Sequence, residues 1–203
     1  GSTVLREDLV DGVIDILITR SEPHPNAGGR YLRDIAKEWG VSEYDACVQL
    51  KPGNACYFQM REDDVQRVIT HPLAMIGSDG LPNDERPHPR LWGAFPRVLA
   101  LYWREKGVLG LAQAIYKMTG MSAQRFRIAD RGVLAAGKAA DVVVFDPRTI
   151  KDNATFENPK QVSEGIEAVW VNGVLSYTAR DGALPARGGR FVRRAGCDSV
   201  LSS

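Results

Sequence analysis

The chain has 203 residues, enough for one good-sized hydrophobic core or for one core and a smaller one. Its 26 Lys and Arg residues against 25 Asp and Glu residues leave a formal net charge of +1, which excludes the basic field that nucleic-acid and membrane-surface binders need. No apolar run approaches the ~20 residues of a membrane-spanning helix. The composition therefore predicts an ordinary soluble globular protein with no nucleic-acid or membrane partner.

The cysteines and histidines form no self-contained metal motif. Cys47, Cys56 and Cys197 contain no CxxC pair, and an odd number of thiols without metal spacing predicts a reducing compartment, which we take to be the cytoplasm. Each of the three histidines is followed by proline, so each is expected in extended or turn backbone. None has the HxH or i, i+4 spacing of a zinc site.

The first fifty residues predict a strand and two helices. The β-rich run 13–19 (VIDILIT) reads as a short strand that ends in a turn cluster. Residues 31–39 place apolar side chains at i, i+3, i+4 and i+7, which predicts an amphipathic helix that Gly40 ends. Ser42 can cap a second helix that runs to about residue 50.

A third helix and a second strand follow. Residues 62–70 begin with three acidic side chains, which suit the positive end of a helix dipole. The apolar run 73–77 predicts a brief buried strand. The alternation of strands and helices over the first eighty residues is typical of an α/β unit.

The pattern changes after Arg131. Before it, residues 95–103 and 110–118 predict helices, and 122–128 predict another helical turn or two. After it, 140–145 (ADVVVF) is strongly β, and Asn172-Gly173 between two apolar runs predicts a hairpin with a type I′ turn. The tail from Gly182 is expected to be extended or frayed. We therefore divide the chain into an α/β part, 1–132, and a small β part, 133–203.

Asp79 is the first candidate for chemistry. It ends the predicted strand 73–77 between two glycines, and in α/β folds the active site lies at the carboxyl ends of the strands. A carboxylate there can act as a general base, hold a metal or orient water. The alternative is an Asx turn in which Asp79 caps its own loop, and spacing alone favours that alternative.

Arg90 is the second candidate, because a preceding Pro-His-Pro stretch can hold its guanidinium in place for a carboxylate ligand. A structural ion pair with Asp84 or Glu85 is at least as compatible with the sequence. His88 is a candidate hydrogen-bonding or orienting residue, and Ser78 a candidate substrate contact. Each also has a purely structural interpretation, as a histidine of the core and as a turn hydroxyl.

The stretch GSDGLPNDERPHPRLWGAFPRVL, which holds these candidates, closely resembles the strand-8 region of the N-acyl-D-amino-acid deacylases (D-aminoacylases) of the amidohydrolase superfamily. The stretches SEPHPNAGGRYLRDIAKEWGVS, KMTGMSAQRFRIADRG and GKAADVVVFDPRTIKDNATFENP resemble the same family in the same order. The resemblance covers nearly the whole chain, from about Val13 to Phe191.

The resemblance implies an architecture for both parts. Residues 1–132 would be the C-terminal part of a (β/α)8 barrel, about strands 7 and 8 with their helices. Residues 133–203 would be part of a small β-sandwich domain and an extended tail.

The resemblance also implies an activity. Members of the family hydrolyse the amide of N-acyl-D-amino acids to a carboxylate and a free D-amino acid, and they use zinc. Asp79 matches the family's general base and acid, which takes a proton from metal-bound water and passes it to the leaving amine. Arg90 matches the residue that binds the substrate α-carboxylate, and Ser78 and His88 lie beside these two in the same stretch.

The chain departs from the family in its metal ligands. The family's zinc site needs an HxH pair, a bridging cysteine or modified lysine, and two further histidines, none of which can be placed here. A (β/α)8 barrel needs ~250 residues, and about 130 are available. We therefore expect a C-terminal portion whose only metal ligand is a weak one, Asp79, and which is inactive and binds zinc poorly by itself.

Two alternatives remain open. The chain could be a non-catalytic remnant or interaction module that pairs with a missing N-terminal barrel segment or with itself. It could also be a scaffold in which Asp79 and Arg90 pair only structurally.

Overall fold

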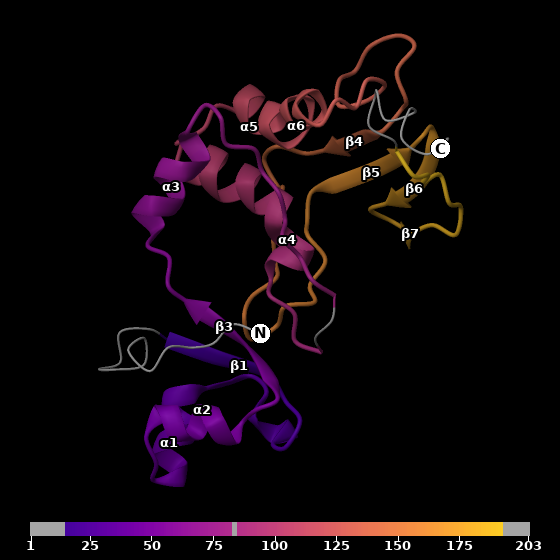
Figure 1. Cartoon of the computed structure of the whole chain (residues 1–203). Helices are drawn as coiled ribbons and strands as arrows, with labels where there is room; N and C mark the ends of the chain where they lie inside the picture. The colour runs from indigo at the N-terminus through magenta and orange to yellow at the C-terminus, as the bar shows by residue number, and fades with distance from the viewer. Residues whose placement is uncertain (1–14, 83–84, 193–203) are drawn as a thin grey trace, which may run out of the picture. The chain divides into compact units, whose positions relative to one another are not determined.

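The structure of the chain, a computed structural model, describes residues 15–82 and 85–192 (Figure 1). The chain forms two compact units, each assembled from three separate segments. Unit 1 comprises the described residues of Gly1–Val65, Asp79–Trp92 and Ala154–Gln161. Unit 2 comprises those of Gln66–Ser78, Gly93–Asn153 and Val162–Ser203.

Unit 1 contains a three-stranded sheet of order β2-β1-β3, formed by β1 (Asp15–Ser21), β2 (Arg30–Tyr31) and β3 (Gly53–Phe58). Both strand pairs are antiparallel, and β1 pairs with β3 from Asp15 opposite Phe58 to Ser21 opposite Gly53. The strand predicted at 13–19 is confirmed from Asp15 onward, and residues 13–14 lie outside the described part. Strand β3 was not predicted.

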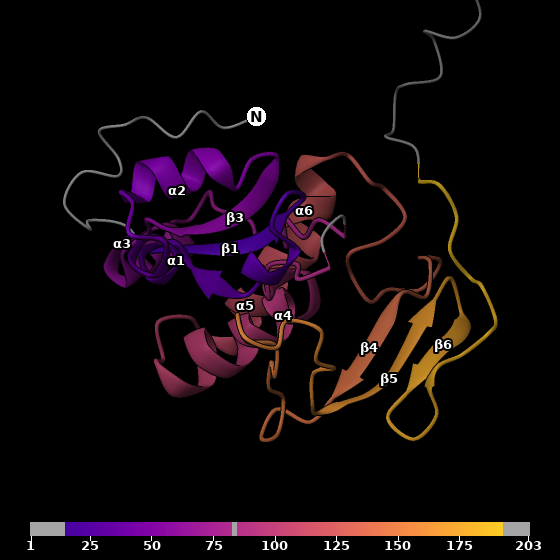
Figure 2. The same cartoon turned by 90° about the horizontal axis from the view of Figure 1, so that it is seen from below.

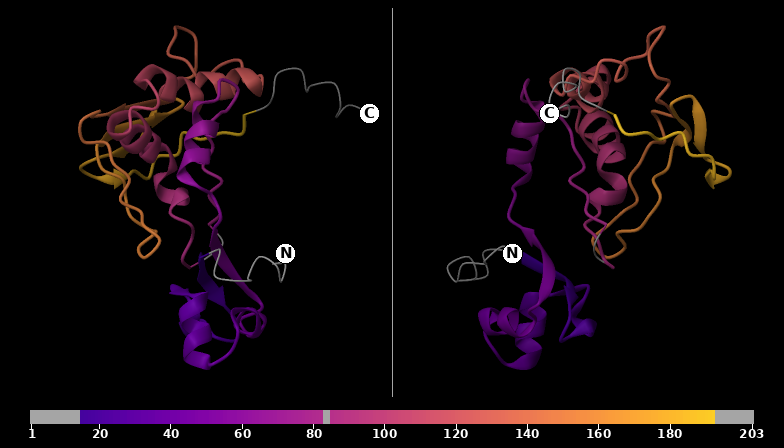
Figure 3. Two further views of the ribbon diagram at one scale, coloured as in Figure 1. Left: turned by 90° about the vertical axis from the view of Figure 1, so that its left-hand side faces the viewer. Right: turned by 45° about the vertical axis from the view of Figure 1, so that its right-hand side comes forward.

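Two helices cover the central strand of this sheet: α1 (Leu32–Trp39) and α2 (Glu43–Gln49) (Figures 2 and 3). Both predicted helices are confirmed. Gly40 adopts a left-handed conformation (φ 66°) and ends α1, as glycine does at helix ends. The Ser42 side chain accepts a hydrogen bond from the Asp45 amide and so caps α2. The core between helices and sheet is apolar: Ile16, Ile18, Ala27, Leu32, Ile35, Ala36, Ala46 and Leu50.

Helix α3 (Glu62–Thr70) is confirmed at the predicted residues, but the strand predicted at 73–77 does not form. The backbone amides of this run make other hydrogen bonds than those of a sheet. The Ala74 amide donates to the His71 carbonyl, and the Ile76 amide donates to the Lys117 carbonyl. Leu73, expected to be buried, is 77% exposed. A short apolar run is ambiguous by itself, since a strand also needs a partner.

The helices between residues 90 and 125 belong mostly to unit 2, which resumes at Gly93 within the first of them. Helix α4 (Arg90–Arg97) passes directly into the π-helical segment η3 (Val98–Glu105), and α5 (Leu111–Met118) and α6 (Gly120–Arg125) follow. The helix predicted at 95–103 is confirmed, but it begins earlier, so Arg90 lies on a helix and not in a loop. Pro96 lies inside α4, where it removes a backbone donor, and the change to π geometry follows directly after it.

Unit 2 also contains an antiparallel sheet of order β4-β5-β6-β7, formed by β4 (Val142–Phe145), β5 (Ile166–Val171), β6 (Val174–Thr178) and β7 (Gly182–Ala183). Asn172 and Gly173 both have positive φ (49° and 78°), which confirms the predicted turn between β5 and β6. No residue of these four strands is fully buried.

Where the structure describes the chain, every strand pair is antiparallel. The parallel neighbours that a (β/α)8 barrel requires are thus not found among these residues. The boundary at residue 132 stays a prediction. In the same described part, no helix is long and apolar enough to cross a membrane.

Candidate functional site

Asp79 lies in irregular backbone, not at the end of a strand as expected. Its φ of 47° is left-handed, a conformation that Asp and Asn tolerate better than other residues with side chains. Its side chain is 77% exposed. A Cβ on Gly80 would lie 2.8 Å from the Leu91 Cα atom, so only glycine allows this part of the chain to approach α4 so closely. The Asp79 carboxylate is therefore accessible on a backbone that is held tightly on one side.

Arg90 pairs with Asp79 through two contacts. Its Nη2 atom lies 2.8 Å from Asp79 Oδ2, and its Nε donates to the main-chain carbonyl of Asp79 at 2.8 Å. The guanidinium therefore contacts both the side chain and the main chain of Asp79. The sequence had suggested Asp84 or Glu85 as structural partners of Arg90. The structure shows Arg90 paired with Asp79, the pair that the scaffold alternative had named, and Asp84 lies outside the described residues.

His88 orients the main chain at Arg90. Its Nδ1 accepts a hydrogen bond from the Arg90 amide at 3.1 Å, which requires that nitrogen to be unprotonated. The edge of its ring packs against Phe156 at 5.0 Å, and Phe156 packs in turn against Phe58 at 4.6 Å. Burial, and then the charge of Arg90, lower the pKa of His88, whereas Asp79 raises it. His88 thus forms a neutral acceptor at the start of α4.

Ser78 precedes Asp79 and is half-buried. Cys47 and Cys56 are also half-buried, in keeping with the small apolar role predicted for them. Cys197 lies outside the described residues.

The described residues do not by themselves fit a zinc site. No group of three or more His, Cys, Asp or Glu side chains among them is placed to hold a metal ion. A catalytic zinc needs about three protein ligands besides water. Asp79 is an exposed carboxylate whose Oδ2 already faces a guanidinium. Within the described part, this site supplies one carboxylate and one arginine.

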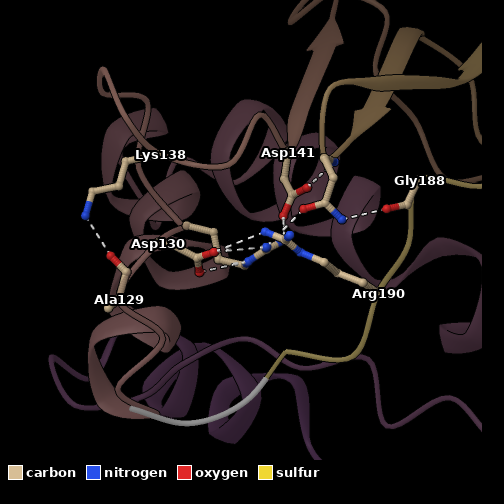
Figure 4. A network of polar contacts seen from close by, with 8 residues as sticks. Ala129, Asp130, Lys138, Asp141, Gly188 and Arg190 are labelled. Atoms are coloured by element: carbon tan, nitrogen blue, oxygen red, sulfur yellow. Dashed lines mark hydrogen bonds and ion pairs between the residues drawn. The ribbon is translucent and has the colours of Figure 1, made fainter.

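A second polar cluster lies in unit 2, where Arg131 donates to Asp130 at 3.2 Å, to Asn172 at 3.0 Å and to Asp141 (Figure 4). Asn172 in turn donates to the Gly188 carbonyl at 2.6 Å. These contacts join the β5–β6 turn to the chain before β4 and to the segment after β7. Because the Arg131 side chain is only 13% exposed and its donors are engaged, we interpret the cluster as structural.

A hollow of about 560 Å³ in unit 1 is lined by β1, the segment after it and the loop before His88. Its lining is mostly polar and includes Ser21, Asn26 and Arg86. Neither Asp79 nor Arg90 lines it, so the described residues do not join this hollow to the candidate site.

Sequence reasoning missed Lys117, which is 2% exposed on α5. The signal was present, because this lysine lies in the predicted helix 110–118 within a run that is otherwise largely apolar.

Comparison with known proteins defines the class. A model of the amidohydrolase family matches residues 17–177, so the chain belongs to that family. The resemblance noted in the sequence is thus confirmed.

The curated proteins similar to this chain include a D-aminoacylase and deacylases of N-acyl-D-amino acids. The chain is 53% identical over 173 residues to the D-aminoacylase of Alcaligenes xylosoxydans xylosoxydans, covering 85% of this chain and 36% of that protein. It is 49% identical over 194 residues to the N-acyl-D-glutamate deacylase of the same organism, covering 95% and 39%. The chain spans little more than a third of the length of these curated relatives.

Solved structures agree. An N-acyl-D-glutamate deacylase from Bordetella bronchiseptica, complexed with zinc and a phosphonate inhibitor, superposes with a TM-score of 0.78 at 53% identity, over 80% of this chain and 34% of that one. A D-aminoacylase structure superposes with a TM-score of 0.84 at 49% identity, over 89% and 38%. The chain therefore has the α/β fold of its amidohydrolase relatives over this length, and metal-bound structures are known among them.

Proposed function

We propose that the chain is the C-terminal portion of a zinc-dependent hydrolase that cleaves N-acyl-D-amino acids to a D-amino acid and a carboxylate. Asp79 is its general base and acid, which takes a proton from the attacking water and returns it to the leaving amine. Arg90 binds the substrate α-carboxylate, beside His88 and Ser78. In the complete enzyme, residues outside those described would hold the zinc, which acidifies the attacking water.

The contact between Asp79 and Arg90 carries this proposal. In an N-acyl-amino acid the amide nitrogen and the carboxylate are attached to the same α-carbon. A group that binds the carboxylate and a group that protonates the amine must therefore lie side by side. Asp79 and Arg90 do so, with 2.8 Å between their charged atoms. A guanidinium has five N–H donors, so Arg90 can keep its bond to the Asp79 backbone while it donates to the carboxylate of a substrate.

The exposure of both groups supports the same proposal. The Arg90 side chain is 39% exposed and that of Asp79 is 77% exposed, so a ligand can reach them. The relatives named above also act on N-acyl-D-amino acids, which supports a substrate of this class.

A second candidate is an interaction module that pairs with a chain supplying further strands. The sheet β4–β7 favours it, because none of its residues is fully buried and Val143 is 54% exposed. Apolar strand residues of this kind ordinarily pack against a second layer. If the chain is instead part of the proposed hydrolase, the layer that covers these strands would belong to the same complete protein.

The test uses a complete chain that contains this segment. Asp79→Asn should lower kcat by about 10²–10⁴-fold and leave KM nearly unchanged, because a general base acts in the transition state. Arg90→Ala should raise KM and also lower kcat, because carboxylate binding positions the amide. Arg97→Ala is the matched control, since Arg97 lies on the same helix and pairs with Asp152 at 3.1 Å.

Full activity of the Asp79→Asn variant would contradict the proposed mechanism. The isolated 203-residue chain should show no turnover with stoichiometric zinc. Turnover of the isolated chain would show that its own residues complete the metal site.

A further inference from the structure

Lys117 is the single charged side chain that is fully buried in the described part of the chain. It lies near the end of α5 and is 2% exposed. Burial of a lysine is costly unless its ammonium finds acceptors, and burial lowers the pKa of this amine. Neither the candidate site nor the proposed mechanism uses Lys117.

The acceptors of Lys117 belong to the segment 71–76, far away in the sequence. Its Nζ donates to the His71 carbonyl at 2.5 Å and to the Ala74 carbonyl at 2.8 Å. Its own main-chain carbonyl accepts a hydrogen bond from the Ile76 amide at 3.1 Å. One residue thus makes three hydrogen bonds to a segment of six residues.

The apolar side chains of this segment are only partly buried. Leu73 is 77% exposed, and no residue of 71–77 is fully buried. His71 follows directly on helix α3, and a cation at the carboxyl end of a helix satisfies carbonyls that have no partner within it. The contacts to Lys117 therefore attach this segment to helix α5.

The segment leads directly to the candidate site, since only Gly77 and Ser78 separate Ile76 from Asp79. Three residues of chain reach at most about 10–11 Å, so fixing Ile76 limits where the Asp79 backbone can lie. Arg90 also holds this part of the chain, through its bond to the Asp79 carbonyl.

We propose that Lys117 is a positioning residue, which fastens segment 71–76 to the end of α5 and so places the chain that carries Asp79. This inference rests on the proposed role of Asp79. A methionine would fill the space of the lysine stem but leave the Ala74 carbonyl without the lysine donor and the His71 carbonyl with the Ala74 amide alone, whereas an arginine keeps the donors.

The first test is hydrogen exchange in the 203-residue chain. Lys117→Met should speed exchange of the Ile76 amide by at least about tenfold, because the hydrogen bonds that protect the segment are lost. Lys117→Arg should recover part of the protection. The control is Leu109→Ala, a cavity-forming change at a residue of unit 2 that is 2% exposed, compared under conditions of equal global stability. Unchanged exchange at Ile76 in Lys117→Met would overturn the proposal.

The second test is kinetic, in a complete chain that contains this segment. Lys117→Met should lower kcat by about 10–100-fold with KM within about threefold, because a displacement near 1 Å at a reacting group has an effect of this size. Lys117→Arg should restore part of kcat, and Leu109→Ala should leave it unchanged. Should Lys117→Met fail to fold, Lys117→Gln, whose side chain is shorter and uncharged, takes its place, and Lys117→Arg remains the variant that keeps the charged donor.

The outcomes separate the two proposals. An unchanged kcat in Lys117→Met, in a protein that Asp79→Asn inactivates, overturns the positioning role alone. Full activity of Asp79→Asn overturns the mechanism and the positioning role together. Leu109→Ala and Lys117→Met could also lower kcat equally at equal stability. In that case the role of Lys117 is only structural, and its positioning role is overturned.

Discussion

Replacement of Asp79 by Asn distinguishes a chemical role from a structural one. Asn has nearly the same shape as Asp and tolerates the left-handed φ of 47° equally well. It removes the negative charge and leaves the main-chain carbonyl that Arg90 binds. The change thus removes the ion pair and the basicity of the side chain with little other disturbance.

The expected change in the free energy of unfolding is small. The two side chains are 39% and 77% exposed, and ion pairs of this kind contribute about 0.2–1 kcal/mol. Salt screens them, so the loss should shrink further at high ionic strength. We therefore expect Asp79→Asn to destabilise the 203-residue chain by less than about 1 kcal/mol, because exposed ion pairs contribute no more than this.

The assay is urea unfolding of the 203-residue chain at low and high salt, with Asp79→Ala as a comparison. Ala also removes the carboxylate, but it has to adopt a positive φ at an added cost of about 1–2 kcal/mol. Asp79→Ala should therefore be clearly less stable than Asp79→Asn. A loss above about 2 kcal/mol in Asp79→Asn, beyond what an exposed pair supplies, would refute this reasoning and favour the scaffold interpretation.

Three further predictions concern the rest of the chain. Because the pKa of His88 lies below its ordinary 6.5 in the folded state, the stabilisation it contributes is complete above pH 6.5 and is lost as the pH falls through the lowered pKa. Unfolding free energies measured from pH 8 to 5 should therefore show less loss in His88→Phe than in the unmodified chain, and parallel curves would contradict this. Arg131→Ala should destabilise the chain by about 1–3 kcal/mol in urea, because Asp130, Asp141 and Asn172 lose the donor of their hydrogen bonds. Arg148→Ala, whose side chain is 87% exposed, should have little effect. Equal losses in the two variants would contradict the structural role of the cluster. Zinc at equimolar concentration should leave the melting temperature of the isolated chain unchanged, and a clear rise would reveal a metal site.

The sequence predicted local structure well where one short-range cause dominates. Ser42 as a cap, Gly40 as a helix end and the Asn172-Gly173 turn are each decided by the chemistry of one or two residues. The acidic start of α3 belongs to the same class.

Long-range pairing was harder to predict. Strand β3 has a mixed, mostly exposed sequence, and its pairing with β1 joins residues more than thirty positions apart. Residues 73–77 look like a buried strand, yet their amides find partners at a helix end and in a local turn. Periodicity reports which residues are apolar, but it does not report which backbone partner is available.

The candidate site was predicted in composition but not in geometry. Asp79, Arg90 and His88 do come together, with His88 holding the Arg90 amide. The pairing of Arg90 with Asp79 was one of several pairings that the sequence left open, because the spacing allowed other acidic partners as well. Lys117 was missed because a long side chain on a helix is expected to reach solvent, and its acceptors lie more than forty residues away.

The interleaving of the two units limits how this protein can be divided. The chain passes from one unit to the other five times, and Asp79 stands directly after one of these crossings. Both Phe58 and His88 pack against the ring of Phe156, which belongs to the short unit 1 segment Ala154–Gln161. A fragment that stops at residue 132 would lose this ring, so no single cut yields two independent folding modules.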